Sequence, residues 1–269
     1  SRVQFSPPAQ IMKLLLSSYS LEPFPLEEVF LLAKEIKADG LELVLMPAVF
    51  KLGLENAKKL SQKHGLPILN LHQPPWGVLF TGQRGITRLI QRAQLIGAKN
   101  IVAHLATMRR GFNSPFFEWV KDVEKESGIN IAFENAAPRG LENWPSYAGQ
   151  PERLEKFVAA RNIHLTFDVA KAFLKGIDPY QFFQRHHPNI KVIHIHGFSR
   201  EGSFHVGFFG NEFDWAGFMS FVRKFDYQGV VTLEIFPLHR WVYFNLPSQS
   251  DFDRAKEIIR ENFEILRRA

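Results

Sequence analysis

Short apolar runs alternate with longer amphipathic segments along the whole chain. The apolar runs are rich in β-branched and aromatic residues and have the length of strands, whereas the longer segments have helical periodicity. Helix signals support this division: Asp178 precedes Pro179 at an expected helix start, and Gly65, Gly97 and Gly128 follow expected helix ends. The pattern therefore predicts strands and helices in strict alternation.

Eight elements of each kind are expected. The strands are Lys13–Tyr19, Gly40–Leu45, Pro67–His72, Asn100–His104, Ile129–Glu134, His164–Asp168, Lys191–His196 and Val230–Ile235. The helices are Pro25–Ala38, Leu54–His64, Arg84–Ile96, Ser114–Ser127, Pro151–Arg161, Asp178–His186, Asp214–Phe225 and Asp251–Arg268.

The expected strands are apolar on both faces, as in a parallel sheet that helices cover. Eight strand-then-helix units in roughly 250 residues have the number and size of a closed barrel. We therefore predict the α/β class and a single (β/α)8 TIM barrel over residues 12–269. A doubly wound open sheet is the alternative, but the first strand-to-helix turn lacks its glycine-rich phosphate-binding fingerprint. Residues 1–11 precede the first methionine and are interpreted as an upstream or expression-derived extension.

Composition narrows the setting of this barrel. The 269 residues are 45% hydrophobic, which suffices for a large core, and no run approaches the roughly 20 apolar residues of a membrane span. Cysteine is absent, so any metal must be held by histidine and carboxylate, and a cytoplasmic location fits. The net charge of +6 is a weak signal for anionic partners. The favoured partner is a small sugar or a phosphorylated substrate. Nucleic acid is disfavoured as a partner but is not excluded, and no membrane partner is expected. The sequence does not indicate the oligomeric state.

Polar side chains that can bind metals stand at the carboxyl ends of six expected strands. In a barrel of this kind these ends meet at one mouth, where active sites form. Several carboxylates brought together there would repel one another and take up protons unless a cation joined them. We therefore expect a divalent metal, with Zn or Mn favoured and one or two ions. The strand-end residues are His72, His104, Glu134, Asp168, His194, His196 and Glu234.

The same motifs resemble those of the xylose isomerase-like TIM barrel superfamily, which includes AP endonuclease family 2 (the endonuclease IV enzymes) and sugar phosphate isomerases and epimerases. The likeness spans nearly the whole barrel in order. It is carried by Asn-Leu-His-Gln-Pro-Pro around His72, Ile-Val-Ala-His-Leu around His104, Phe-Glu-Asn around Glu134, Thr-Phe-Asp-Val-Ala-Lys around Asp168, Ile-His-Ile-His-Gly around His194, and Thr-Leu-Glu-Ile around Glu234.

The resemblance implies a first metal site made of Glu134, Asp168, a histidine of strand seven and Glu234. It also implies a second site made of His72, His104 and a bridging Glu134. The third site of the endonucleases lacks two of its three ligands, because their Asp-x-x-His reads Asp168-Val-Ala-Lys171 and their Asp-x-His reads Ser203-Phe-His205. A trinuclear DNA-repair site is therefore not expected.

Residues around this centre are candidates for substrate binding. We place His194 and His196 on opposite faces of their strand, so only one of them is a metal ligand. His194 fits the endonuclease-like pattern and is favoured, whereas the epimerase-like pattern can be aligned to His196, which otherwise lies on the substrate side. Lys171 either neutralises a phosphate or carboxylate of the substrate or forms a structural salt bridge to Glu134 or Asp168. The remaining candidates are Arg200, His205 and Trp76.

Two chemistries suit this set of residues. In an isomerase or epimerase, the metal holds adjacent sugar oxygens while the catalytic residues Glu134 and Glu234 move the proton. In a two-metal phosphodiester hydrolase, similar to endonuclease IV or to the cobamide-remodelling phosphodiesterases, His72 and His104 supply the second site. A sugar- or metal-binding barrel without turnover is the third hypothesis. The isomerase or epimerase is the favoured function.

Overall fold

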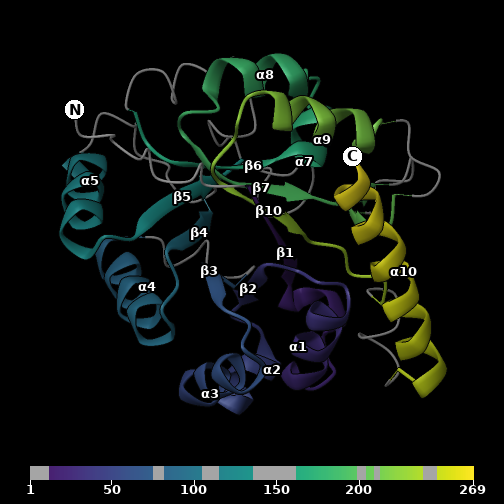
Figure 1. Cartoon of the computed structure of the whole chain (residues 1–269). Helices are drawn as coiled ribbons and strands as arrows, with labels where there is room; N and C mark the ends of the chain where they lie inside the picture. Colours follow the sequence, from purple (N-terminus) through teal and green to yellow (C-terminus); the bar gives the residue numbers. More distant parts are fainter. Residues whose placement is uncertain are drawn as a thin grey trace, which may run out of the picture.

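The chain folds into a closed barrel of parallel strands surrounded by helices (Figure 1). A computed structural model describes residues 12–74, 82–104, 115–135, 162–198, 204–208, 213–238 and 247–269. The barrel strands, in chain order, are β1 (Lys13–Ser17), β2 (Gly40–Val44), β3 (Ile68–His72), β4 (Asn100–His104), β5 (Asn130–Glu134), β6 (Leu165–Asp168), β7 (Ile190–Ile195) and β10 (Val230–Leu233). Each strand pairs with its neighbour in this order, and β10 closes the ring against β1.

Helices cover the outside of this ring (Figure 1). They are α1 (Leu26–Glu35), α2 (Pro47–Leu52), α3 (Leu54–His64), α4 (Gln83–Ile96), α5 (Pro115–Ser127), α7 (Val169–Leu174), α8 (Pro179–His186), α9 (Trp215–Lys224) and α10 (Gln249–Arg268), with a 3-10 turn, η1, at Ser18–Leu21. A short antiparallel hairpin, β8 (Gly197–Phe198) and β9 (Phe204–Val206), follows β7. No helix among the described residues is both long enough and apolar enough to cross a membrane.

Local signals set the ends of several helices. Gly65 and Gly97 end α3 and α4 with φ of 63° and 79°, a left-handed conformation that a glycine adopts without strain. Asp168 caps the start of α7 by accepting a hydrogen bond from the backbone N–H of Lys171. The last residue of β6 therefore both ends a strand and begins a helix, which fixes its carboxylate at the barrel mouth.

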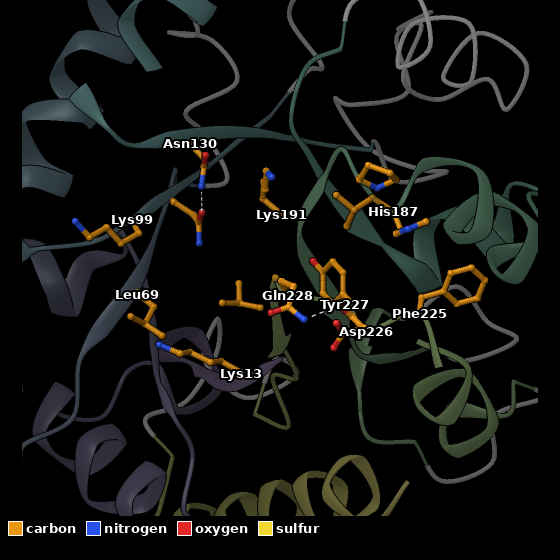
Figure 2. Close-up of a pocket in the computed structure, with 15 residues that line it drawn as sticks. Lys13, Leu69, Lys99, Asn130, His187, Lys191, Phe225, Asp226, Tyr227 and Gln228 are labelled. Atoms are coloured by element: carbon orange, nitrogen blue, oxygen red, sulfur yellow. Dashed lines mark hydrogen bonds between the residues drawn. The ribbon is translucent and has the colours of Figure 1, made fainter. Parts of the chain in front are cut away.

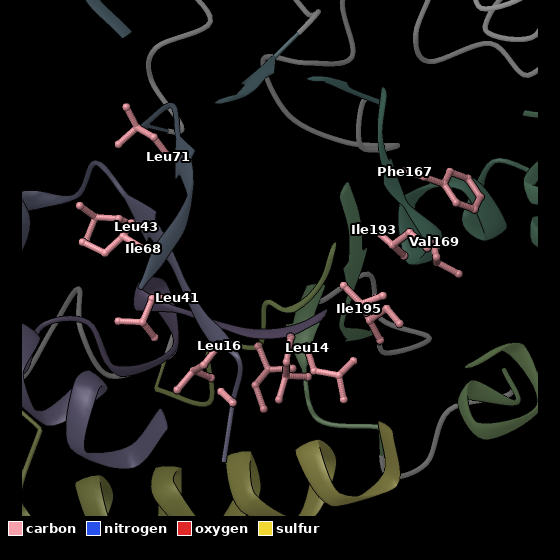
Figure 3. Close-up of a cluster of buried hydrophobic side chains, with 14 of the residues drawn as sticks. Leu14, Leu16, Leu41, Leu43, Ile68, Leu71, Phe167, Val169, Ile193 and Ile195 are labelled. Atoms are coloured by element: carbon pink, nitrogen blue, oxygen red, sulfur yellow. The ribbon is translucent and has the colours of Figure 1, made fainter. Parts of the chain in front are cut away.

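Two apolar layers hold the barrel, because successive side chains of a strand point to opposite faces. On β1, Leu14 and Leu16 belong to the large cluster between strands and helices, which Figure 3 shows around the outside of the strands. Leu15 lies between them in sequence and points inward to a small cluster with Val102 and Val192. The inner layer is small, and polar side chains such as Glu42, Asn70, Asn100 and Thr232 fill much of the rest of the interior.

The predicted fold is confirmed, and all eight expected strands are present. Sequence reasoning did not anticipate α2, α7 or the β8–β9 hairpin, because elements of two to six residues are too short to show a period. The helix expected at Pro151–Arg161 and the extension at residues 1–11 lie outside the described residues.

Candidate metal centre

Four acidic and imidazole side chains meet at the carboxyl end of the barrel. Glu134 ends β5, Asp168 ends β6, His194 lies near the end of β7 and Glu234 directly follows β10. Each offers one ligand atom, and these atoms lie within 4.8 Å of one another. All four residues are buried, so the strand ends that the sequence marked do converge on one place.

His194 joins the carboxylates of this cluster. Its Nδ1 lies 2.8 Å from Oε1 of Glu134 and 3.1 Å from Oε2 of Glu234. Its Nε2 lies 3.0 Å from Oε2 of Glu42. Burial by itself lowers the pKa of His194, but the surrounding carboxylates, Glu42 first among them, outweigh it and raise that pKa well above its ordinary value.

Sequence reasoning missed Glu42, the carboxylate beneath His194. It lies in the middle of β2 and has no exposed surface. Besides His194, its Oε2 accepts hydrogen bonds from Nδ2 of Asn70 at 3.0 Å and from the hydroxyl of Thr232 at 3.2 Å. A charged residue inside a strand that is otherwise apolar, Gly40-Leu41-Glu42-Leu43-Val44, was the available signal.

A row of asparagines continues from Glu42 across the inside of the barrel. Asn70, Asn100 and Asn130 pair in register on β3, β4 and β5. The amide of Asn130 donates to Oδ1 of Asn100 at 2.7 Å, and the amide of Asn100 donates to Oδ1 of Asn70 at 2.9 Å. Because the carboxylate of Glu42 only accepts, it fixes the direction of donation along this asparagine ladder.

Lys171 lies inside the cluster. Its ammonium is 2.9 Å from Oδ2 of Asp168 and 3.1 Å from Oε1 of Glu134. Burial works to raise the pKa of both carboxyls, but Lys171 and the neighbouring histidines outweigh it, so the pKa of Asp168 falls to about 2 and that of Glu134 lies well below its ordinary value. The salt bridge that the sequence offered as one role of Lys171 is therefore present.

His72 and His104 form a second group with Glu134. One ligand atom of each lies within 4.8 Å of the others, and Nε2 of His104 is 3.4 Å from Oε2 of Glu134. Burial is the main reason that the pKa of His104 is lowered to about 3. A neutral imidazole is the form that binds metals, so this group has the chemistry of a further ligand set.

The expectation that His194 and His196 point to opposite faces is wrong. Residues two apart in a strand share a face, and both side chains contact acids of the cluster. Nε2 of His196 lies 3.1 Å from Oδ2 of Asp168, and its Nδ1 accepts a hydrogen bond from the backbone N–H of His205.

The β8–β9 hairpin folds His205 back over the site. The backbone of His205 has a positive φ of 58°, and its Nδ1 lies 2.9 Å from the carbonyl oxygen of Glu234. The other two predicted substrate-binding residues, Trp76 and Arg200, lie outside the described residues.

The charges and donors of this centre fit a divalent cation. Four buried carboxylates, those of Glu42, Glu134, Asp168 and Glu234, lie at this centre, and the ammonium of Lys171 pairs with two of them, Glu134 and Asp168. Within the described residues, Oε2 of Glu234 accepts no well-oriented hydrogen bond although it is fully buried. Carboxylate oxygens with one imidazole are ligands that suit Mn or Zn. Glu134, Asp168, His194 and Glu234 would hold such an ion, and the donor set leaves its identity open.

Comparison with known proteins finds relatives that share this fold. A family model described as "Xylose isomerase-like TIM barrel" matches residues 30–269. An uncharacterized protein of Mycobacterium leprae, ML2432, is 24% identical over 212 residues, which cover 69% of this chain and 74% of the relative. Among solved structures, the 3-keto-D-glucoside 4-epimerase YcjR from E. coli superposes with a TM-score of 0.69 at 15% identity, covering 96% of this chain and 100% of that one. The D-allulose 3-epimerase from Methylomonas sp., in complex with D-allulose, superposes with a TM-score of 0.67 at 13% identity, covering 96% and 97%.

Proposed function

Because the chain belongs to the xylose isomerase-like TIM barrel family, we propose that it is a divalent-metal-dependent isomerase or epimerase of sugars or sugar phosphates. The observation that carries this proposal is the convergence of Glu134, Asp168, His194 and Glu234 within one ion's reach. Two structural neighbours are sugar epimerases by name, which supports the choice of a sugar as substrate class.

Glu134 and Glu234 are the proposed proton carriers. Both carboxylates contact the same nitrogen of His194, which lies on β7. Glu234 follows β10, the neighbour of β7 on one side, and Glu134 ends β5, which lies beyond β6 on the other side. Burial would raise the pKa of each, but Lys171 for Glu134 and His194 for Glu234 outweigh it and hold the pKa well below its ordinary value. Both groups are therefore ionised at neutral pH, as a proton acceptor must be.

The other residues of the site bind and orient the substrate. A bound divalent ion would polarise neighbouring sugar oxygens and acidify the C–H between them. His196 and His205 present imidazoles beside Asp168 and Glu234, where they can hold sugar hydroxyls. Lys171 neutralises Asp168 and Glu134 and keeps both in the acceptor form.

An isotope-exchange assay tests this proposal. Protein loaded with Mn or Zn is incubated with ketohexoses, pentuloses and their phosphates in deuterated water, and deuterium at carbon is measured by mass spectrometry. Glu134→Gln and Glu234→Gln should each lower exchange by about a hundredfold or more while the circular dichroism spectrum is kept. Glu35→Gln makes the same chemical change at a surface ion pair with Arg260 and should leave exchange unchanged. Full exchange in either site variant, or none with any substrate in the wild type, would refute the proposal.

A two-metal phosphodiester hydrolase is the second candidate, favoured by the group of His72, His104 and Glu134. Hydrolysis of bis-p-nitrophenyl phosphate by the metal-loaded protein, lost in His104→Ala, would support it over the isomerase. If the wild type neither exchanges deuterium nor hydrolyses the ester but still binds a sugar, the barrel is a binding protein.

A further inference from the structure

A cavity of about 510 Å³ opens at the amino-terminal end of the barrel (Figure 2). The carboxylate cluster lies at the other, carboxyl end of the strands. The first residues of several barrel strands line it, among them Lys13 of β1, Asn130 of β5 and Val230 of β10. Strand starts and the short turns that lead into β4, β7 and β10 form its walls, and every lining residue belongs to the described part of the chain. Its volume is that of a site for a small organic molecule.

Positive charge dominates the lining of this basal cavity. Three lysines line it, at or next to the starts of three strands: Lys13 on β1, Lys99 just before β4 and Lys191 on β7. Asp226 is the one acidic residue of the lining. Within the described residues, no ion pair joins any of the three lysines to a carboxylate. The three lysines therefore bring positive charge to the rim of this cavity, which attracts anions.

A buried hydroxyl also lacks a partner at this place. Tyr227 is only 5% exposed, and its hydroxyl makes no hydrogen bond within the described residues. In Figure 2 the hydroxyl is turned toward the middle of the cavity, but its oxygen has almost no exposed surface, so a ligand reaches it only after neighbouring side chains shift. Burial raises the pKa of Tyr227 well above its ordinary value, so the phenol keeps its proton and can donate it. A buried polar group without a partner costs stability, and a ligand that accepts its hydrogen bond would remove that cost.

Gly229 keeps the space for this hydroxyl. A Cβ added at Gly229 would lie 2.1 Å from the hydroxyl oxygen of Tyr227 and 2.7 Å from the carbonyl oxygen of Lys191. Any other residue would push the phenol away or displace β7. The position of the Tyr227 ring therefore requires glycine at position 229.

We propose that this basal cavity binds a small organic phosphate. The three lysines supply the charge and Tyr227 donates to a phosphate oxygen. The amide nitrogen of Asn130 is committed to Asn100, which leaves its Oδ1 to accept from a hydroxyl of the ligand. Leu69 and Phe225 line the cavity with apolar surface against which the carbon skeleton packs. The site is separate from the metal centre and does not depend on the reaction proposed there.

Calorimetric titration of the chelator-treated protein tests this site, with ribose 5-phosphate as probe and inorganic phosphate and ribose as comparisons. Ribose 5-phosphate should bind saturably and more tightly than either comparison. The triple variant Lys13→Gln, Lys99→Gln, Lys191→Gln should weaken binding by about tenfold or more. The matched triple Lys51→Gln, Lys59→Gln, Lys121→Gln removes the same charge from the exposed faces of α2, α3 and α5 and should leave affinity unchanged.

Tyr227→Phe separates a ligand role from a structural one. It should weaken binding of ribose 5-phosphate by about fivefold while leaving the unfolding temperature unchanged or higher, because it removes a buried hydroxyl that has no partner. Shifts in the 1H–15N spectrum on titration should centre on Asn130, Tyr227 and Gly229. Equal affinity for ribose 5-phosphate and inorganic phosphate, equal affinity of wild type and Tyr227→Phe, or shifts centred on His72 and His194 would each overturn the proposal.

Discussion

Replacing Glu42 by glutamine tests how the metal centre is held in place. Oε2 of Glu42 receives three donors, Nε2 of His194 at 3.0 Å, Nδ2 of Asn70 at 3.0 Å and the hydroxyl of Thr232 at 3.2 Å. The hydrogen bond from Nε2 leaves Nδ1 of His194 facing Glu134 and Glu234, the nitrogen that a cation would bind. Histidine ligands are commonly oriented by a carboxylate on their other nitrogen in this way.

The expected magnitude follows from these contacts. Glutamine keeps the shape and the accepting oxygen but removes the charge, which turns a charge-assisted hydrogen bond into a neutral one. That difference is about 1–2 kcal/mol, or about 5- to 30-fold in an equilibrium constant. Loss of a carboxylate partner of a metal-binding histidine typically lowers metal affinity by about 10- to 100-fold. We therefore expect Mn or Zn to bind Glu42→Gln about tenfold to a hundredfold more weakly.

Two measurements make the assay decisive. Calorimetric titration of chelator-stripped protein gives metal affinity for the wild type, Glu42→Gln and the control Thr166→Val, which removes another buried polar contact, to the carbonyl oxygen of Ala132. Nitrogen NMR of histidine-labelled wild type should show the proton on Nε2 of His194 and the metal on Nδ1. Wild-type metal affinity in a folded Glu42→Gln, or metal on Nε2, would refute the reasoning, and the NMR result does not depend on whether the variant folds.

Three further predictions concern the metal, the lysine and the core. Adding metal at 100 times its Kd should stabilise the protein by about 2.7 kcal/mol and raise its unfolding temperature by about 5 °C or more in calorimetry, an increase that EDTA should reverse and whose absence would contradict the metal centre. Lys171→Met should lower the stability of the metal-free protein by about 3–5 kcal/mol in urea, because Asp168 and Glu134 lose their ion pair. The same variant should bind metal more tightly, because a neighbouring cation is removed. Unchanged metal affinity would show that Lys171 does not oppose the ion. Phe183→Ala should cost about 3–5 kcal/mol in the same urea assay, since the ring is fully buried against Phe218 and Tyr227, whereas Phe50→Ala, at a side chain 49% exposed, should cost under about 0.5 kcal/mol.

The strands and their polar ends could be predicted because their signals are local. An apolar run that stops at Glu134 or Asp168 is visible in the sequence, and strand ends of a parallel barrel meet by construction of the fold. The hairpin that returns His205 to the site could not be predicted, because β8 and β9 contribute only two and three residues and the pairing crosses a bulge. The relation of His194 to His196 was open to correct prediction, since the two-residue period of a strand already places them together.

Glu42 shows what local reasoning leaves out. Its three donors come from β3, β7 and β10, and the residues are separated by 28, 152 and 190 positions in sequence. Only closure of the ring brings Thr232 and His194 across the interior to β2. The strand pattern does show that the carboxylate of Glu42 is buried on whichever face of β2 it lies. A buried carboxylate without partners would cost several kcal/mol, so partners are to be expected. Barrel sequences can therefore be searched for an inward carboxylate on one strand followed by inward asparagines at matching register on the next three. Each of these residues alone indicates nothing, whereas the row together indicates a polar interior that supports a metal site.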